Sequence, residues 1–189
     1  REPRVFYVTT GYRLVALDAR TGARIAGFGV DGIVDLKEGV VFGSRQPIDP
    51  INGEIGLHAT PAVAGDVVMI GSAMREGGTP KTHNNTKGIV QAFDVKTGKR
   101  LWNFNTIPRP GEFGNDTWQN DSWSFTGHTN AWPPMTLDAQ RGLVYVPLGT
   151  PSNDFFGGRR PGANLFAESI VCLDANTGIR KWHFQIVHH

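Results

Sequence analysis

The chain has 189 residues, and 19 Lys and Arg against 17 Asp and Glu leave a formal net charge of only +2. So small a charge gives no electrostatic reason to expect nucleic acid or an anionic membrane as a partner. Glycine (24 residues) and proline (12) are enriched, and 10% of the chain is aromatic. This composition excludes disorder, coiled coil and collagen, and it is typical of many short strands joined by turns and long loops.

Along the chain, three segments rich in β-branched and aromatic residues are predicted to be strands. They are residues 4–8, 66–70 and 143–146. No segment carries a helical period over eleven residues, and no apolar run reaches the 18 or so residues of a membrane helix. The single cysteine, Cys172, lies between Val171 and Leu173 and is interpreted as a small core residue.

A repeated motif is the most informative feature of the sequence. Leu14–Gly22, Ile89–Gly98 and Ile170–Gly178 align without gaps, and each ends in Asp-x-x-Thr-Gly. This ending predicts a hairpin, because the Asp side chain can accept hydrogen bonds within the turn and glycine tolerates a positive φ. Four residues after the glycine stand Trp102 and Trp182 in the second and third copies, whereas the first copy has Ala26. Each tryptophan is predicted to pack one sheet against the next.

The spacing of the motif predicts an all-β fold with about four strands per repeat, as in a β-propeller. Its aspartates are 76 and 80 residues apart, more than the 40 to 50 or so residues of a compact blade. The excess is assigned to long loops at residues 29–58, 74–87, 108–130 and 150–168, where function is expected.

The pattern Ala92-x-Asp94-x-x-Thr97-Gly98-x-x-x-Trp102 resembles the tryptophan-docking repeat of the pyrroloquinoline quinone (PQQ) dehydrogenases. The runs from Gly88 to Gly98 and from Trp182 to His189 are most similar to the membrane-bound glucose and quinate branch. The resemblance implies part of an eight-bladed propeller, with about three blades in one segment, 1–189, and repeats near 4–29, 60–105 and 143–185. It identifies the chain as an internal fragment that needs the remaining blades.

The resemblance also implies an activity: PQQ-dependent oxidation of an alcohol or sugar hydroxyl, with electrons passed to ubiquinone or a cytochrome. A periplasmic location follows, with attachment to the inner membrane as an option. In the family the proposed catalytic base lies in an Asp-x-Trp-Asp segment, which would follow His189, so no catalytic residue is expected within this chain.

The resemblance assigns roles to residues of this chain that stand at functional positions of the family. The resemblance places Glu76 on a ligand of Ca²⁺ or another hard cation, a role that suits a carboxylate. Ala73, Met74 and Arg75 fall on cofactor-contacting positions, where Arg75 could pair with a cofactor carboxylate. Relatives place a Thr or Ser against the cofactor where this chain has His58, and Thr60 is the nearest hydroxyl. Asn130 would hydrogen-bond the quinone, and Trp132 would form a flat floor beneath it.

The sequence leaves the roles of several residues undecided. Relatives place an asparagine metal ligand where Thr150 stands, so either the ligand is lost or Asn153 or Asp154 replaces it. Trp118 and Trp123 are interpreted as loop packing or pocket wall, and the turn Gly157–Arg160 is interpreted as solvated. Two other functions remain: a propeller that serves as an assembly scaffold of the bacterial outer membrane, and a sugar-binding propeller.

Overall fold

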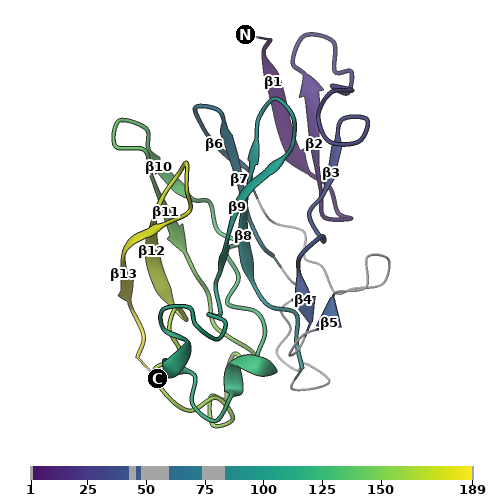
Figure 1. Cartoon of the computed structure of the whole chain (residues 1–189). Helices are drawn as coiled ribbons and strands as arrows, with labels where there is room; N and C mark the ends of the chain where they lie inside the picture. The colour runs from purple at the N-terminus through teal and green to yellow at the C-terminus, as the bar shows by residue number, and fades with distance from the viewer. Residues whose placement is uncertain (1, 43–45, 48–59, 74–83, 189) are drawn as a thin grey trace.

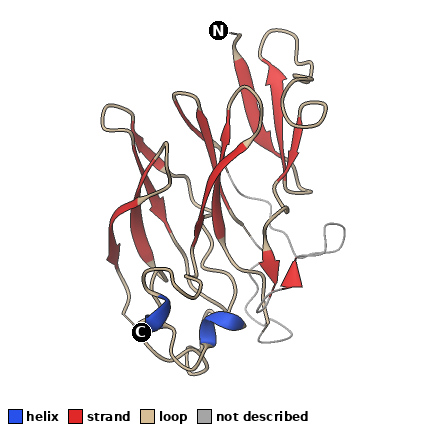
Figure 2. Ribbon diagram, in the orientation of Figure 1, coloured by secondary structure: helices blue, strands red, loops and turns tan. Residues whose placement is uncertain are grey.

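The computed structural model describes residues 2–42, 46–47, 60–73 and 84–188. Three antiparallel sheets stand side by side, with the central one between the other two (Figures 1 and 2). The first sheet contains β1 (Arg4–Val8), β2 (Arg13–Asp18) and β3 (Ile33–Asp35). The second contains β6 (Ala62–Ala64), β7 (Val67–Gly71), β8 (Ile89–Asp94) and β9 (Arg100–Asn105). The third contains β10 (Thr136–Asp138), β11 (Leu143–Pro147), β12 (Ser169–Asp174) and β13 (Arg180–Gln185).

The remaining elements are small. A two-stranded sheet pairs β4 (Val41–Phe42) with β5 (Gln46–Pro47), and two 3₁₀ turns, η1 (Asn115–Thr117) and η2 (Ser122–Ser124), lie between β9 and β10. In the part of the chain that the structure describes, no helix is long and apolar enough to span a membrane. The segment 29–58, interpreted from sequence as a loop, contains β3, which pairs with β2 as the third strand of the first sheet.

The central sheet has a hydrophobic core on each face. Alternate side chains of a strand point to opposite faces, so Val67 and Met69 of β7 join one core while Val68 and Ile70 join the other. This explains why every residue of β7 is buried. Cys172 is buried, as its apolar neighbours predicted, but on the opposite face of β12 from Val171 and Leu173, which belong to the core between the second and third sheets.

The repeated motif forms the same turn in each sheet. In the central one, Asp94 Oδ1 accepts hydrogen bonds from the Thr97 backbone N–H (2.7 Å) and hydroxyl (2.8 Å). Gly98 follows with a φ of 71°, a conformation that glycine adopts without strain. Asp18 and Asp174 hold their turns through the same type of bond. The predicted hairpins are therefore confirmed.

The two interfaces between sheets are stabilised by hydrogen bonds from different side chains. Between the second and third sheets, the buried Trp102 donates its indole N–H to the carbonyl of Ala175 (3.1 Å), the residue after the turn aspartate. Between the first and second, Arg4 Nη1 donates to the equivalent carbonyl, that of Val95 (2.8 Å). The first repeat has Ala26 at the position of the docking tryptophan, and Arg4 makes the corresponding hydrogen bond instead.

Candidate cofactor and substrate site

The two ends of the sheets differ in their connections. All Asp-x-x-Thr-Gly turns lie at one end, while β7–β8, β9–β10 and β11–β12 are joined at the other by long connections that include η1 and η2 (Figure 1). Loops that leave equivalent strands of neighbouring sheets open on the same side. The long-loop end is therefore where residues from separate sheets can meet.

A buried hydrogen bond joins two of these long connections. Ser72 follows β7, and its hydroxyl donates to Asn130 Oδ1 (3.1 Å), while the backbone N–H of Ile89 donates to Ser72 Oγ (2.9 Å). The Asn130 backbone carbonyl accepts from Gly149 N–H (2.9 Å), just after β11. Asn130 is thus fixed by the second and third sheets together.

Close backbone packing brings the same segments together. At Gly71, a Cβ atom would collide with the carbonyl oxygen of Ala131, so only glycine permits this approach. Trp132 comes next and is 47% exposed, in contrast to the buried docking residue Trp102. The indole of Trp132 is therefore available to contact a ligand at the long-loop end.

The other sequence-predicted residues fall into two groups. Ala73 is buried beside Ser72, and Thr60 is exposed two residues before β6. Met74, Arg75 and Glu76, together with His58, lie outside the described residues. The structure therefore joins Asn130 to Ser72, the residue before Ala73, and it leaves the metal-ligand assignment untested.

Thr150, which stands where relatives have the asparagine ligand, is hydrogen-bonded to an acidic residue that the sequence analysis did not identify. Thr150 donates its hydroxyl to the carboxylate of Glu168, which directly precedes β12. The Glu168 backbone N–H also contacts the carbonyl of Gly149 (3.3 Å). Sequence reasoning missed Glu168, because 18 residues separate it from Thr150 and no local motif marks the pair.

Among the described residues, no group of three or more His, Cys, Asp or Glu could hold a metal ion. Side-chain oxygens of Asn130 and Glu168 lie instead on adjoining segments of the long-loop end. Amide and carboxylate oxygens are ligands that Ca²⁺ prefers. The donor chemistry of this end therefore fits a hard cation if a further carboxylate, such as that of Glu76, completes the set.

A buried lysine ties the loops together. Lys87 is 1% exposed, and its Nζ donates to the carbonyls of Trp123 (2.6 Å) and Thr126 (2.5 Å). Burial, reinforced by the positive charge of Arg109, lowers the pKa of Lys87 to about 6. The amine is therefore predominantly neutral at pH 7.

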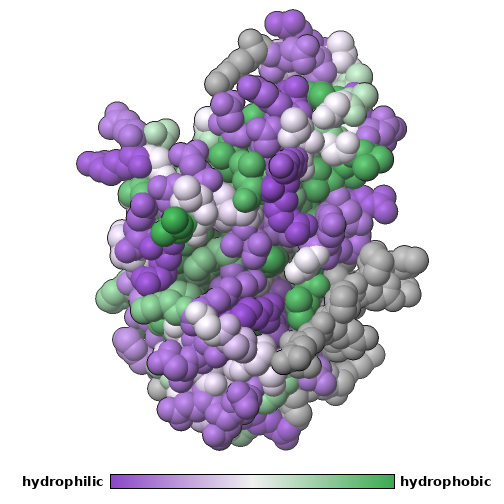
Figure 3. Space-filling view, in the orientation of Figure 1, coloured by the Kyte–Doolittle hydropathy of each residue, from purple (hydrophilic) through white to green (hydrophobic). Residues whose placement is uncertain are grey.

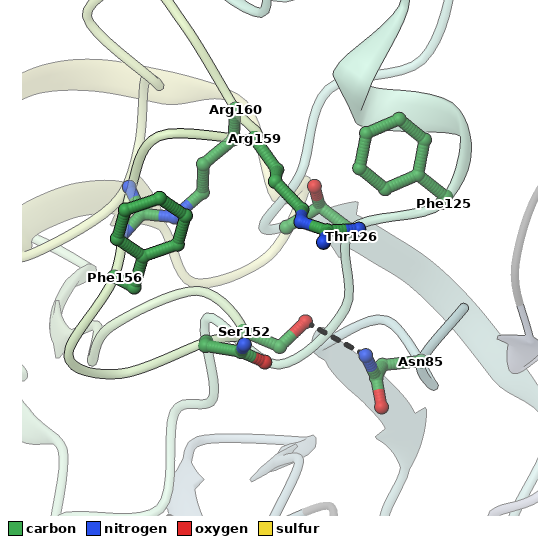
Figure 4. Close-up of a pocket in the computed structure, with 8 residues that line it drawn as sticks. Asn85, Phe125, Thr126, Ser152, Phe156, Arg159 and Arg160 are labelled. Carbon is green, nitrogen blue, oxygen red and sulfur yellow. Dashed lines mark hydrogen bonds between the residues drawn. The ribbon is translucent and has the colours of Figure 1, made fainter. Parts of the chain in front are cut away.

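A small pocket opens beside these loops (Figure 4). Its lining comes from three connections: Asn85, Phe125, Thr126, Ser152, Asn153, Phe156, Arg159 and Arg160. We call it the arginine pocket. The interpretation of Gly157–Arg160 as solvated is wrong for Arg160, which is 7% exposed and donates from Nη1 to Asn164 Oδ1 (2.7 Å).

The two loop tryptophans were interpreted as loop packing or pocket wall. Trp118 is buried, and its indole N–H donates to the carbonyl of Leu165, so it packs the β9–β10 connection against the β11–β12 connection. Trp123 is half-buried and contributes its backbone carbonyl to Lys87.

Side-by-side antiparallel sheets, a docking tryptophan and loops gathered at one end define part of a β-propeller. Comparison with known proteins agrees. The family model described as "PQQ: Glucose/ethanol/alcohol dehydrogenase, beta-propeller domain" matches residues 1–189. The chain therefore belongs to the PQQ dehydrogenase β-propeller family, and the prediction of a partial propeller of this type is confirmed.

Individual relatives lie in the same family. The chain is 33% identical to the quinate/shikimate dehydrogenase (quinone) of Acinetobacter baylyi and 31% identical to the quinoprotein glucose dehydrogenase of Escherichia coli. Each match covers 98% of the chain and 22% of the relative. A solved quinohemoprotein alcohol dehydrogenase from Pseudomonas putida HK5 superposes with a TM-score of 0.71 at 30% identity, over 98% of this chain and 25% of that one. The chain thus spans about a fifth of the length of these curated relatives.

Proposed function

We propose that the chain supplies cofactor-binding blades of a PQQ-dependent dehydrogenase that oxidises a hydroxyl group of a sugar, polyol or hydroxy acid. The observation that carries the proposal is the buried Ser72–Asn130 hydrogen bond, which brings two long connections together beside the exposed indole of Trp132. Membership of the family supports the same conclusion.

In this proposal each residue has a distinct task. Trp132 offers its face to the planar cofactor, and Asn130, held by Ser72 and Gly149, keeps its amide in position to hydrogen-bond the quinone. Thr60, Ala73, Met74 and Arg75 complete the contacts, and Glu76 holds Ca²⁺ or another hard cation. When bound, PQQ supplies the hydride acceptor and the cation the Lewis acid that polarises its carbonyl.

The proposal places the remaining steps outside these 189 residues. The base that takes the proton of the substrate hydroxyl is expected beyond His189, and further blades would close the ring around the cofactor. Electrons would pass to ubiquinone or to a cytochrome, and the enzyme would work in the periplasm. A relative such as the quinate/shikimate dehydrogenase, named for a quinone acceptor, supports the acceptor class.

The test is the affinity of the full-length protein for PQQ. We expect Trp132→Ala to weaken PQQ binding by about 1–3 kcal/mol, by analogy with the stacking of bases on aromatic side chains. Trp123→Ala is the matched control, because Trp123 belongs to the same β9–β10 connection but is assigned no contact with the cofactor. A fluorescence titration of the apo-protein with PQQ measures both.

A second variant tests the metal role. Glu76→Gln removes a charge but little volume, so it should weaken Ca²⁺ binding measured by calorimetry and leave the far-ultraviolet circular dichroism unchanged. If neither variant changed PQQ or Ca²⁺ affinity, the site assignment would be wrong. If the wild-type protein bound no PQQ, the scaffold or sugar-binding function would replace the enzymatic one.

A further inference from the structure

The arginine pocket adjoins the segment that leads to Asn130. Ser152 and Gly127 exchange hydrogen bonds, from Gly127 N–H to Ser152 Oγ and from Ser152 N–H to the Gly127 carbonyl, each 3.1 Å. Gly127 lies three residues before Asn130. The pocket therefore lies against the β9–β10 connection that carries Asn130, at the long-loop end of the sheets.

Its size limits what can enter. The free volume is about 10 Å³, which is the space of about one water-sized group. Neither a sugar ring nor a cofactor fits, whereas the tip of a larger molecule could reach in from the mouth. Phe125 and Phe156 form apolar walls on either side of the Arg159 guanidinium (Figure 4).

Two side chains in the lining are buried and make no hydrogen bond from particular atoms within the described residues. Thr126, 1% exposed, leaves its hydroxyl unpaired, and Arg160 leaves its Nε–H unpaired. Both are hydrogen-bond donors. An unpaired buried donor is costly, so the pocket is suited to a group that accepts hydrogen bonds.

The two arginines of the pocket differ in their charged neighbours. Arg159 is exposed and forms no ion pair with any residue that the structure describes. The carboxylates of Glu168 and Asp154 lie close enough to act electrostatically on Arg160 and to offset its charge, which leaves the charge of Arg159 uncompensated. An anionic acceptor would therefore meet Arg159 without displacing an existing partner.

We propose that the arginine pocket binds the carboxylate of the substrate, so that the enzyme selects hydroxy acids over neutral polyols. One carboxylate oxygen enters the pocket, the guanidinium of Arg159 covers the other, and the hydroxylated part of the substrate extends toward Asn130. Arg–carboxylate hydrogen bonds are among the strongest in proteins. The inference rests on the proposed function and adds the substrate class to it.

The kinetic test uses the full-length enzyme loaded with PQQ and Ca²⁺. Quinate, a cyclic hydroxy acid, is compared with glucose and glycerol, which are neutral. We expect Arg159→Gln to raise the ratio of KM for quinate to KM for glucose about tenfold to a hundredfold, the worth of a charge-assisted hydrogen bond. Arg159→Lys should restore part of the preference. Arg141→Gln is the matched control, because Arg141 is an exposed arginine that pairs with Asp138 at the opposite end of the sheets.

A binding measurement separates this proposal from the proposed function. Calorimetric titration of the PQQ-free protein with quinate should show binding that weakens with Arg159→Gln and with added salt. An unchanged KM ratio in Arg159→Gln, or tight binding of chloride with none of quinate, would overturn the proposal. If the loaded enzyme oxidised none of the three substrates, the proposed function would fail, whereas the titration would still decide whether the pocket takes a carboxylate.

Discussion

Lys87 shows how a buried charge can be accommodated by losing its proton. A neutral amine carries two N–H groups, and the structure provides two acceptors, the carbonyls of Trp123 and Thr126. The ammonium form would add a third donor and a charge in a buried place close to Arg109. The protonation state of Lys87 therefore affects how firmly the β9–β10 connection is held.

This leads to a pH-dependent stability. The pKa of Lys87 is about 6 in the folded chain and about 10.5 when unfolded, so the unfolded chain binds more protons between these values. Stability should therefore rise with pH across this window, by at most about 1.4 kcal/mol per pH unit. Urea unfolding at pH 6.5 and pH 8.5 measures the rise. Lys87→Met should be less stable at both pH values, because two carbonyls lose their donor. Its free energy of unfolding should lack the increase with pH that Lys87 contributes. An equal increase with pH in the variant would contradict the role of Lys87.

Gly71 tests the geometry of the site without touching a ligand-binding group. In Gly71→Ala the new methyl group would press on the carbonyl of Ala131 and displace Asn130 and Trp132. We expect the PQQ affinity of the full-length protein to fall although no predicted cofactor contact is removed. Gly27→Ala is the control, since a Cβ at Gly27 meets no atom within 4 Å. Equal PQQ affinity in the two variants would show that this close approach does not position the site.

At the scale of the element, the docking tryptophan joins one sheet to the next. Truncating Trp102 to alanine would remove a buried indole and leave the Ala175 carbonyl without its donor. We expect Trp102→Ala to lower the free energy of unfolding by about 3–5 kcal/mol, measured by urea denaturation. Leu101→Ala, at the exposed neighbouring position of β9, should change it little; a comparable loss there would mean that the indole has no special role.

The sequence predicted these elements because their signals are local. Asp94, Thr97 and Gly98 form their turn among themselves, and Trp102 follows at a fixed spacing. The replacement at the first interface could not be predicted, since Arg4 lies 91 residues from the carbonyl that it contacts. Nor did a periodic pattern mark β3, a strand of only three residues.

In the candidate site, too, some residues could be predicted from the sequence and others could not. Asn130 and Trp132 were assigned from the resemblance to the family, and the structure places Asn130 where two long connections meet. Glu168 and the burial of Arg160 depend on how the β11–β12 connection folds back, through contacts such as that of Arg160 with Asn164. Such contacts arise from tertiary packing, so neither composition nor spacing indicated them.

At the scale of the whole molecule, apolar side chains remain at the surface. Trp182, the third-sheet counterpart of Trp102, is 44% exposed, and Phe184 and Ile186 near it are also exposed. Figure 3 shows hydrophobic residues (green) reaching the surface among hydrophilic ones. We expect the 189-residue chain on its own to associate or to bind a hydrophobic dye, as proteins with large apolar patches do. A monomer in analytical ultracentrifugation that binds no dye would contradict this.

The repeated turn aspartates have a consequence for the uptake of protons. Backbone hydrogen bonds from Thr21 lower the pKa of Asp18; at Asp94 and Asp174 burial opposes the shift, and hydrogen bonds from Thr97 and Thr177 outweigh it. Each turn therefore stabilises the fold above the ordinary carboxyl pKa and loses that contribution as the pH falls through its lowered value. Because the turns are equivalent, their three carboxylates should take up protons together on acid unfolding, and so should Asp138, whose pKa is lowered by its hydrogen bonds from Arg141. A potentiometric titration of folded against urea-unfolded chain below about pH 4 measures the total uptake. Every further blade with the same turn would add its aspartate to this uptake, so the acid transition would become steeper with each blade that carries the motif.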